Sequence, residues 1–183
     1  MQTCVVHTPG MHTPQELSAI ADGEALSVGG LYWPRPYFPT RSERAGLIGE
    51  AIPDWAIPTG ATAAWIWTGM SSPTPLAVLR PAKPALSPLA RQLWRARELS
   101  PARHTVVTVA GQKILDPLSA QNELLRHGSS IDGDATQLLF LRDLHGDQRA
   151  PTLMRLSRAQ RDHVDAVLER MRTLRERYPD ITR

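Results

Sequence analysis

Cysteine is almost absent from this chain of 183 residues. Cys4 is the single one, so the chain forms no internal disulfide and has no cysteine pair for a zinc site. No apolar run approaches the roughly 18 residues that a membrane-spanning helix needs. The first ten residues, MQTCVVHTPG, have neither the basic start nor the apolar stretch of a secretory signal peptide. From these absences we expect a cytoplasmic protein with no membrane partner.

Motifs of catalysis and metal binding are also missing. The six histidines are scattered, and the glycines never form a phosphate loop with its lysine. Asp54, Asp116 and Glu123 are conceivable as the metal-binding carboxylates of a nuclease. However, Asp54 follows Pro53 in an expected turn, and Asp116 has the position of a helix cap. We therefore expect no catalysis, no metal ion and no cofactor, and no convergent cluster of carboxylates, histidines or nucleophiles within hydrogen-bonding reach in the largest pocket.

Proline, by contrast, is abundant. The chain contains 16 prolines, which break it into short elements and argue against a long helical bundle. Its length and its 42% of hydrophobic residues suit a folded domain with a proper core. We expect an α+β fold, in which a small mixed or antiparallel sheet is packed by helices and a C-terminal amphipathic helix follows.

The stretch 58–80 predicts a buried helix followed by a strand. Thr59 can cap the helix, alanines favour it, and Gly69 can end it. The residues at the spacing of one buried face are Ala61, Ala64, Trp65 and Thr68. We expect Ala64 and Trp65 to be nearly fully buried against the sheet.

Four strands are expected beside this helix in one sheet. They are residues 76–79, 92–99, 105–109 and 113–115. The third is β-branched throughout, and Ala110-Gly111 predicts a tight hairpin turn before the fourth. Residues 31–38, LYWPRPYF, predict an edge strand or extended arm, because their prolines cannot donate to a sheet ladder.

The other helices are marked by their first residues. Capping boxes begin at Thr13, Thr40 and Ser157, and Asp116 and Asp134 are further helix starts. The last helix is amphipathic. It is either a docking helix with a solvated charged face or a dedicated binding helix. We divide the chain into a short N-terminal helix and arm (1–30), a core α+β domain (31–150) and a C-terminal docking helix (151–183).

Basic charge is concentrated in one block. Residues 80–113 contain seven Lys/Arg and one Asp/Glu, a net charge of +6, whereas residues 1–79 and 114–151 each carry −3. Such a block can be the electrostatic footprint of nucleic acid or of an acidic protein partner. The candidate nucleic-acid-binding residues are Arg80, Lys83, Arg91, Arg95, Arg97 and Arg103. Strand alternation would aim Arg95 and Arg97 to the same face. The alternative is that these arginines only protect an edge strand from aggregation.

Two other residues of this block have competing interpretations. Trp94 lies among the arginines, where it either stacks on a base or packs under the sheet. His104 precedes the clearest strand, and we expect it to lead the chain into that strand rather than to bind a ligand.

From about residue 31 to residue 128, the order of elements resembles the core domain of AbiEi-type antitoxins, which belong to type IV toxin–antitoxin systems. Those proteins have a Thr/Ser-Ala-Ala-x-x-x-x-Gly helix, which corresponds here to residues 62–69, TAAWIWTG. A proline-led strand follows, as in 75–80, and then a basic pair of strands. The family block Thr-x-Pro-x-Arg-Thr-x-x-Asp is similar to residues 110–119. These keep the proline, while Ser119, Ala120 and Glu123 stand near the places of the other three residues.

The resemblance implies a non-enzymatic antitoxin or transcriptional regulator. Such a protein acts with a nucleotidyltransferase-type toxin, without necessarily forming a stable complex, and contacts DNA. The family usually begins with a winged helix-turn-helix that reads operator DNA, whereas residues 11–33 leave room here for one short helix and an arm. Two alternatives stay open: a protein-interaction domain that has lost its DNA reader, and a diverged nuclease-like enzyme.

Overall fold

The computed structural model describes residues 13–28, 31–34, 39–71, 73, 75–81, 86–88, 94–145 and 156–179. The described helices and strands, in chain order, are α1 (Pro14–Ala21), β1 (Ala25–Val28), β2 (Leu31–Pro34), α2 (Arg41–Ala51), β3 (Ile57–Pro58), α3 (Gly60–Thr68), β4 (Leu76–Arg80), β5 (Trp94–Glu98), β6 (Val106–Val109), β7 (Gln112–Leu115), α5 (Pro117–His127), α6 (Ile131–His145) and α7 (Arg158–Arg177). The fold is α+β, which confirms the predicted class. None of these helices combines the length and the apolar character needed to cross a bilayer.

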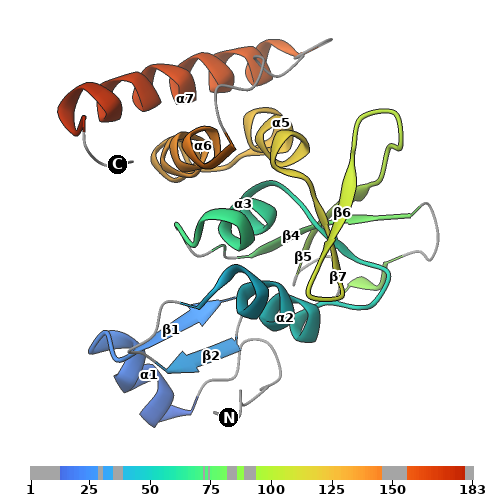
Figure 1. Ribbon diagram of the computed structural model, residues 1–183, viewed down its shortest axis with the longest axis vertical. Coiled ribbons are helices and arrows are strands. Elements are labelled where there is room, and N and C mark those ends of the chain that lie inside the picture. The colour runs from blue at the N-terminus through green and yellow to red at the C-terminus, as the bar shows by residue number, and fades with distance from the viewer. Residues whose placement is uncertain are drawn as a thin grey trace.

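The strands form separate small sheets rather than the single expected one. β4 pairs antiparallel with β3 and parallel with β5, while β6 and β7 make a hairpin of their own. The one-sheet prediction was wrong because the chain after β5 is bound to α5, where the backbone N–H of Thr105 donates to Ser119 Oγ at 2.9 Å. The hairpin packs on α2 and β3 instead of extending the sheet (Figure 1).

The hairpin and the N-terminal arm follow their local signals. Ala110 and Gly111 have positive φ angles of 49° and 84°, as the tight turn between β6 and β7 requires. β2 covers the first half of the predicted arm and pairs with β1, a strand that the sequence analysis did not anticipate. Residues 35–38 lie outside the described residues.

Helix α3 lies at the centre of the molecule. Ala64 is fully buried and Trp65 is 2% exposed, as predicted. The expectation of one buried face was wrong, because all residues from Thr62 to Trp67 are buried. Helices α2, α5 and α6 and strand β4 surround α3, and its alanines allow this close approach. The Thr62 hydroxyl accepts the Ala77 N–H at 2.7 Å, which holds α3 directly against β4.

Both ends of α3 are fixed by residues of the predicted types. Gly69 ends the helix in the left-handed conformation at φ 76°. Thr59 has the extended backbone of an N-cap, but its side chain makes no capping hydrogen bond. Its hydroxyl donates instead to Glu123 Oε2 at 3.5 Å. The predicted side-chain cap is therefore replaced by a contact with α5.

Helices α5, α6 and α7 form a layer at the opposite end of the molecule from α1, β1 and β2 (Figure 1). Val164, Val167 and Met171 of α7 are buried in a second hydrophobic cluster with α5 and α6, so α7 is a docking helix. Helix α6 begins at Ile131 rather than at Asp134. Ser130 makes the cap, since its hydroxyl accepts the Gly133 N–H, and the Asp134 carboxylate turns back to accept the Ser130 N–H at 3.1 Å.

Candidate functional site

A pocket of about 210 Å³ lies where α3 begins, where β4 and β5 run in parallel and where α5 gives way to α6. One part of its wall is apolar and includes Ala61, Pro73, Pro75, Ala77 and Leu124. The other part is charged and includes Arg95, Arg97, Glu123, His127 and Asp134. Segments separated by more than 70 residues therefore meet at one site.

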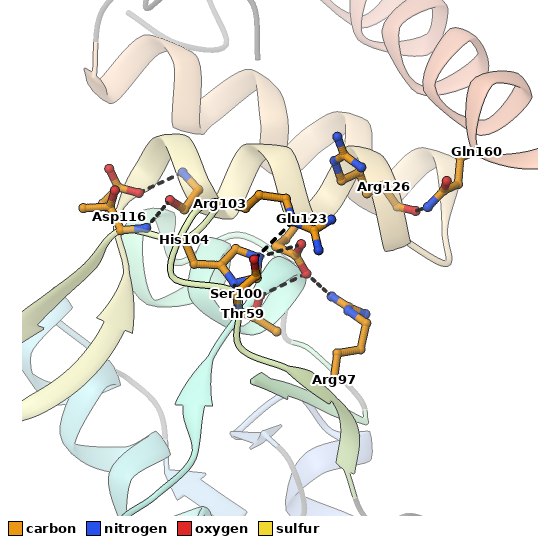
Figure 2. Close-up of polar contacts among 11 residues, drawn as sticks. Thr59, Arg97, Ser100, Arg103, His104, Asp116, Glu123, Arg126 and Gln160 are labelled. Carbon is orange, nitrogen blue, oxygen red and sulfur yellow. Dashed lines mark hydrogen bonds and ion pairs between the residues drawn. The ribbon is translucent and has the colours of Figure 1, made fainter. Parts of the chain in front are cut away.

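Glu123 is the centre of a buried polar network at this pocket. Its carboxylate forms an ion pair with Arg97, accepts the Thr59 hydroxyl, and lies 3.2 Å from His104 Nε2 (Figure 2). Burial by itself acts to raise the pKa of Glu123. The charge of Arg97 and the hydrogen bonds from Arg97 and His104 outweigh it and hold the pKa below its usual value. Glu123 is therefore an ionised, fully engaged carboxylate that positions its neighbours.

The tautomer of His104 follows from its two partners. The Ser100 N–H donates to Nδ1 at 3.1 Å, so Nδ1 carries no proton. Nε2 then carries the proton and donates it to Glu123 Oε1. His104 leads into β6, as predicted, and it also fastens the loop after β5 to α5 (Figure 2). This contact across 19 positions has no signal in the sequence.

Arginines from three segments gather around His127, a partly exposed residue at the C-terminal end of α5. Burial is the largest influence that lowers its pKa, and the charges of Arg97, Arg126 and Arg103 lower it further against the opposing effect of Glu123. We call Arg95, Arg97, Arg103, Arg126 and His127 the basic cluster. Sequence reasoning missed Arg126 and His127, because they lie on a helix within a segment of net negative charge.

The predicted basic block does not form a single surface. Arg95 and Arg97 lie opposite Ala77 and Leu79 in the ladder and both line the pocket, which confirms that they share a face. Arg80 lies opposite Glu98 in the β4–β5 ladder. Because neighbouring residues of a strand alternate between faces, its side chain is on the other face of the sheet. Arg103 is exposed in the turn after β5, where its Nε donates to Ser100 Oγ at 3.4 Å. Two further predicted residues, Lys83 and Arg91, lie outside the described residues.

Asp134 closes the far side of the pocket. Its carboxylate is buried against the α5–α6 turn and lies 3.5 Å from His163 Nε2 of α7. Burial raises the pKa of Asp134, although the backbone N–H of Ser130 and the charges of His163 and Arg95 act in the opposite direction. Asp134 therefore lines the pocket and also contacts the α5–α6 turn and α7, so its carboxylate connects the pocket wall to the docked helix.

Glu123, His127 and Asp134 all line this pocket, but sharing a pocket wall does not put their side chains within hydrogen-bonding reach of one another, so the expectation of no convergent cluster stays a prediction. Asp54 is exposed and Asp116 caps α5 by accepting the Ser119 N–H at 2.8 Å, so the imagined carboxylate trio is not assembled. Within the described ranges, no group of three His, Cys, Asp or Glu side chains is placed to hold a metal ion.

Trp94 belongs to the hydrophobic core rather than to the pocket. Its ring meets Trp55 edge-on, at 6.2 Å between centroids, and packs against the main cluster. The packing interpretation of this tryptophan is therefore confirmed.

No family model matches the chain, and no curated protein or solved structure does either. The resemblance to AbiEi-type antitoxins therefore stays a prediction that rests on the quoted motifs. The proposed function therefore rests on the geometry of the pocket and of the basic cluster.

Proposed function

We propose that the protein is a non-enzymatic regulator of the antitoxin kind, which contacts nucleic acid through the basic cluster. The observation that supports it is that Arg97, Arg103 and Arg126, from β5, the following turn and α5, lie close enough to His127 for their charges to lower its pKa, while Arg95 lines the same pocket as His127. A nucleotidyltransferase-type toxin as functional counterpart is inferred from the quoted sequence motifs alone, and a place in the cytoplasm from what the sequence lacks. A nucleotidyltransferase gene beside this one would support that part.

The cluster suits a phosphate backbone more than a single buried anion. Arg95 and Arg103 are exposed, so their charges are available to a ligand, whereas Arg97 shares its charge with Glu123. Such a surface neutralises about two to four phosphates, and each contributes about −0.9 to the slope of log affinity against log salt. We therefore expect moderate affinity, a clear salt dependence and little dependence on base sequence.

The test is a titration of labelled DNA and RNA with wild type and with the double variant Arg95→Ala/Arg103→Ala, at about 50 and 200 mM salt. Arg97 is left in place because its substitution would also unbalance Glu123. The double variant should bind several-fold more weakly at the lower salt and lose much of its salt dependence. The matched control, Arg172→Ala/Arg177→Ala on α7, removes the same charge from a distant helix and should bind as wild type does.

Equal binding by all three proteins, or binding insensitive to salt, would contradict the proposal. The protein-interaction alternative would then account better for the basic cluster, with an acidic protein as its ligand. A nuclease-like function finds no support in the pocket, since Glu123 is among its described lining residues and Asp54 and Asp116 are not.

A further inference from the structure

The proposed contacts with the phosphate backbone do not account for the pocket beside the basic cluster, with its limited volume and its apolar wall. At about 210 Å³ it is smaller than the roughly 300–1,000 Å³ clefts that hold whole drug-sized ligands. It therefore has room for one ring-sized group rather than a large molecule. Its position is specific, because Arg95 and Arg97 both line it and also belong to the basic cluster.

The two kinds of wall suit two parts of one ligand. Ala61, Pro73, Ala77 and Leu124 give an apolar side without charge, against which the face of a flat ring can pack. Exposed Ser129, exposed His127 and Arg95 stand on the polar side, where N–H and O–H groups can meet ring edges and a phosphate. A nucleotide has this combination, with an apolar ring face, polar ring edges and an anionic group attached.

We propose that this pocket receives one nucleotide unit with an unpaired base, the base lying on the apolar wall and its phosphate facing Arg95 and His127. The inference rests on the proposed nucleic-acid contact and names the form of nucleic acid that fits. In a duplex the base must first be unstacked and unpaired, which is costly, while in a single strand it is already accessible. The protein therefore prefers single-stranded over double-stranded nucleic acid.

The experiment compares a labelled single-stranded 12-residue oligonucleotide with its duplex, in fluorescence anisotropy at constant salt. Wild type should bind the single strand about tenfold more tightly, the order of effect of one well-placed base. Ser129→Trp puts a large side chain at the rim of the pocket and keeps the backbone group of position 129 that hydrogen-bonds to Asp134. This variant should bind the single strand no better than the duplex, with unchanged duplex affinity.

Two further variants make the result unambiguous. Ser42→Trp changes an exposed serine of α2 in the same way and should keep the preference of wild type. Ala61→Leu fills the pocket from α3 without adding an aromatic ring, so it should lose the preference even if the new tryptophan at position 129 stacks on bases itself. Circular dichroism and the unfolding midpoint of each variant show that it is folded.

A separate arm identifies the source of the nucleotide. Adenosine and guanosine monophosphates compete with the single strand at similar concentrations if the pocket takes free nucleotides. They compete only at much higher concentrations if neighbouring phosphates on the strand contribute. Equal binding of single strand and duplex by wild type, or a preference that survives both pocket-filling variants, would overturn the inference and leave a water-filled pocket. The salt-dependent binding lost in Arg95→Ala/Arg103→Ala would still stand in that case, so the two proposals fail separately.

Discussion

Arg44 shows how a single charged residue can complete the end of another helix. Although it lies on α2, its Nε and Nη2 donate to the Ile66 carbonyl of α3, at 3.0 and 2.8 Å, and its Nη1 donates to Pro39. Carbonyls in the last turn of a helix have no partner within the helix, and a cation there also complements the helix dipole. A buried arginine therefore acts as a remote C-cap for α3.

Replacement of Arg44 by leucine should lower the free energy of unfolding by about 2–6 kcal/mol. The change leaves two buried carbonyl oxygens without donors, each of which costs about 1–3 kcal/mol. Urea unfolding of Arg44→Leu and wild type measures the difference. Arg44→Lys should fall between them, because an ammonium group can serve one carbonyl but not both sides of a planar fork. A leucine variant as stable as wild type would show that water replaces the arginine.

Glu123→Gln should affect stability and nucleic-acid binding in opposite directions. The amide still accepts a hydrogen bond, but Arg97 loses its buried counter-charge, which should destabilise the fold by about 1–3 kcal/mol. The released charge of Arg97 joins the basic cluster, so affinity for nucleic acid should rise and its salt slope should steepen by about 0.9. Urea unfolding and the two-salt titration measure the two effects. Weaker binding together with lower stability would indicate that Glu123 organises the cluster rather than masking it.

At the scale of the elements, alanine substitutions at two glycines with different surroundings should change stability in opposite directions. A Cβ on Gly128, between α5 and α6, would lie 2.0 Å from Asp134 Oδ2 and 2.6 Å from the Leu124 carbonyl oxygen. A Cβ on Gly46, on the exposed side of α2, would meet nothing within 4 Å. Gly128→Ala should therefore destabilise by about 2 kcal/mol or more, and Gly46→Ala should stabilise by about 0.5–1 kcal/mol. Unfolding midpoints of both variants should move to opposite sides of wild type, and a shift of both in one direction would contradict the packing at this turn.

The elements that were predicted well are those whose signals are local. The capping boxes of α1, α2 and α7 each join a residue to one three positions later, and both hydrogen bonds of each box are present. The turn Ala110-Gly111 likewise sets the β6–β7 hairpin from two residues. Periodicity failed for α3, because a helix surrounded on every side has no polar face to give a period.

The parts that were missed depend on contacts between distant segments. Strand alternation predicted that Arg95 and Arg97 share a face, but only the fold brings Arg97 to Glu123, 26 positions away. The single predicted sheet failed for the same reason, since the contacts of residues 104 and 105 with α5 lead the hairpin away from β5. Net charge by segment placed Arg126 in an acidic region, although in space it belongs to the basic cluster.

At the scale of the whole molecule, stability should fall as the pH is lowered below about 6.5. Burial, followed by the charges of Arg97 and Arg41 respectively, lowers the pKa values of His127 and His145 below the usual 6.5. Below that pH the unfolded chain binds protons at these positions that the folded protein resists, so the free energy of unfolding decreases with falling pH. The loss begins near 6.5 and levels off below the lowered values.

The two histidines lie at the C-terminal ends of different helices, α5 and α6, so the effect does not depend on one segment. His145, at the end of α6, packs edge-on against Trp67 of α3, at 5.4 Å between ring centroids, and His127 lies at the end of α5 by the pocket. Urea midpoints at several pH values test it with wild type and His127→Gln/His145→Gln. In the double variant the stability should no longer decrease with falling pH. Asp134 does not replace the lost effect, because its raised pKa gives the opposite slope: as the pH falls, the folded protein binds a proton there before the unfolded chain does. An equal decrease in both proteins would assign the pH dependence to other groups, and greater stability of wild type at the lower pH would show that the opposite slope from Asp134 outweighs the two histidine shifts.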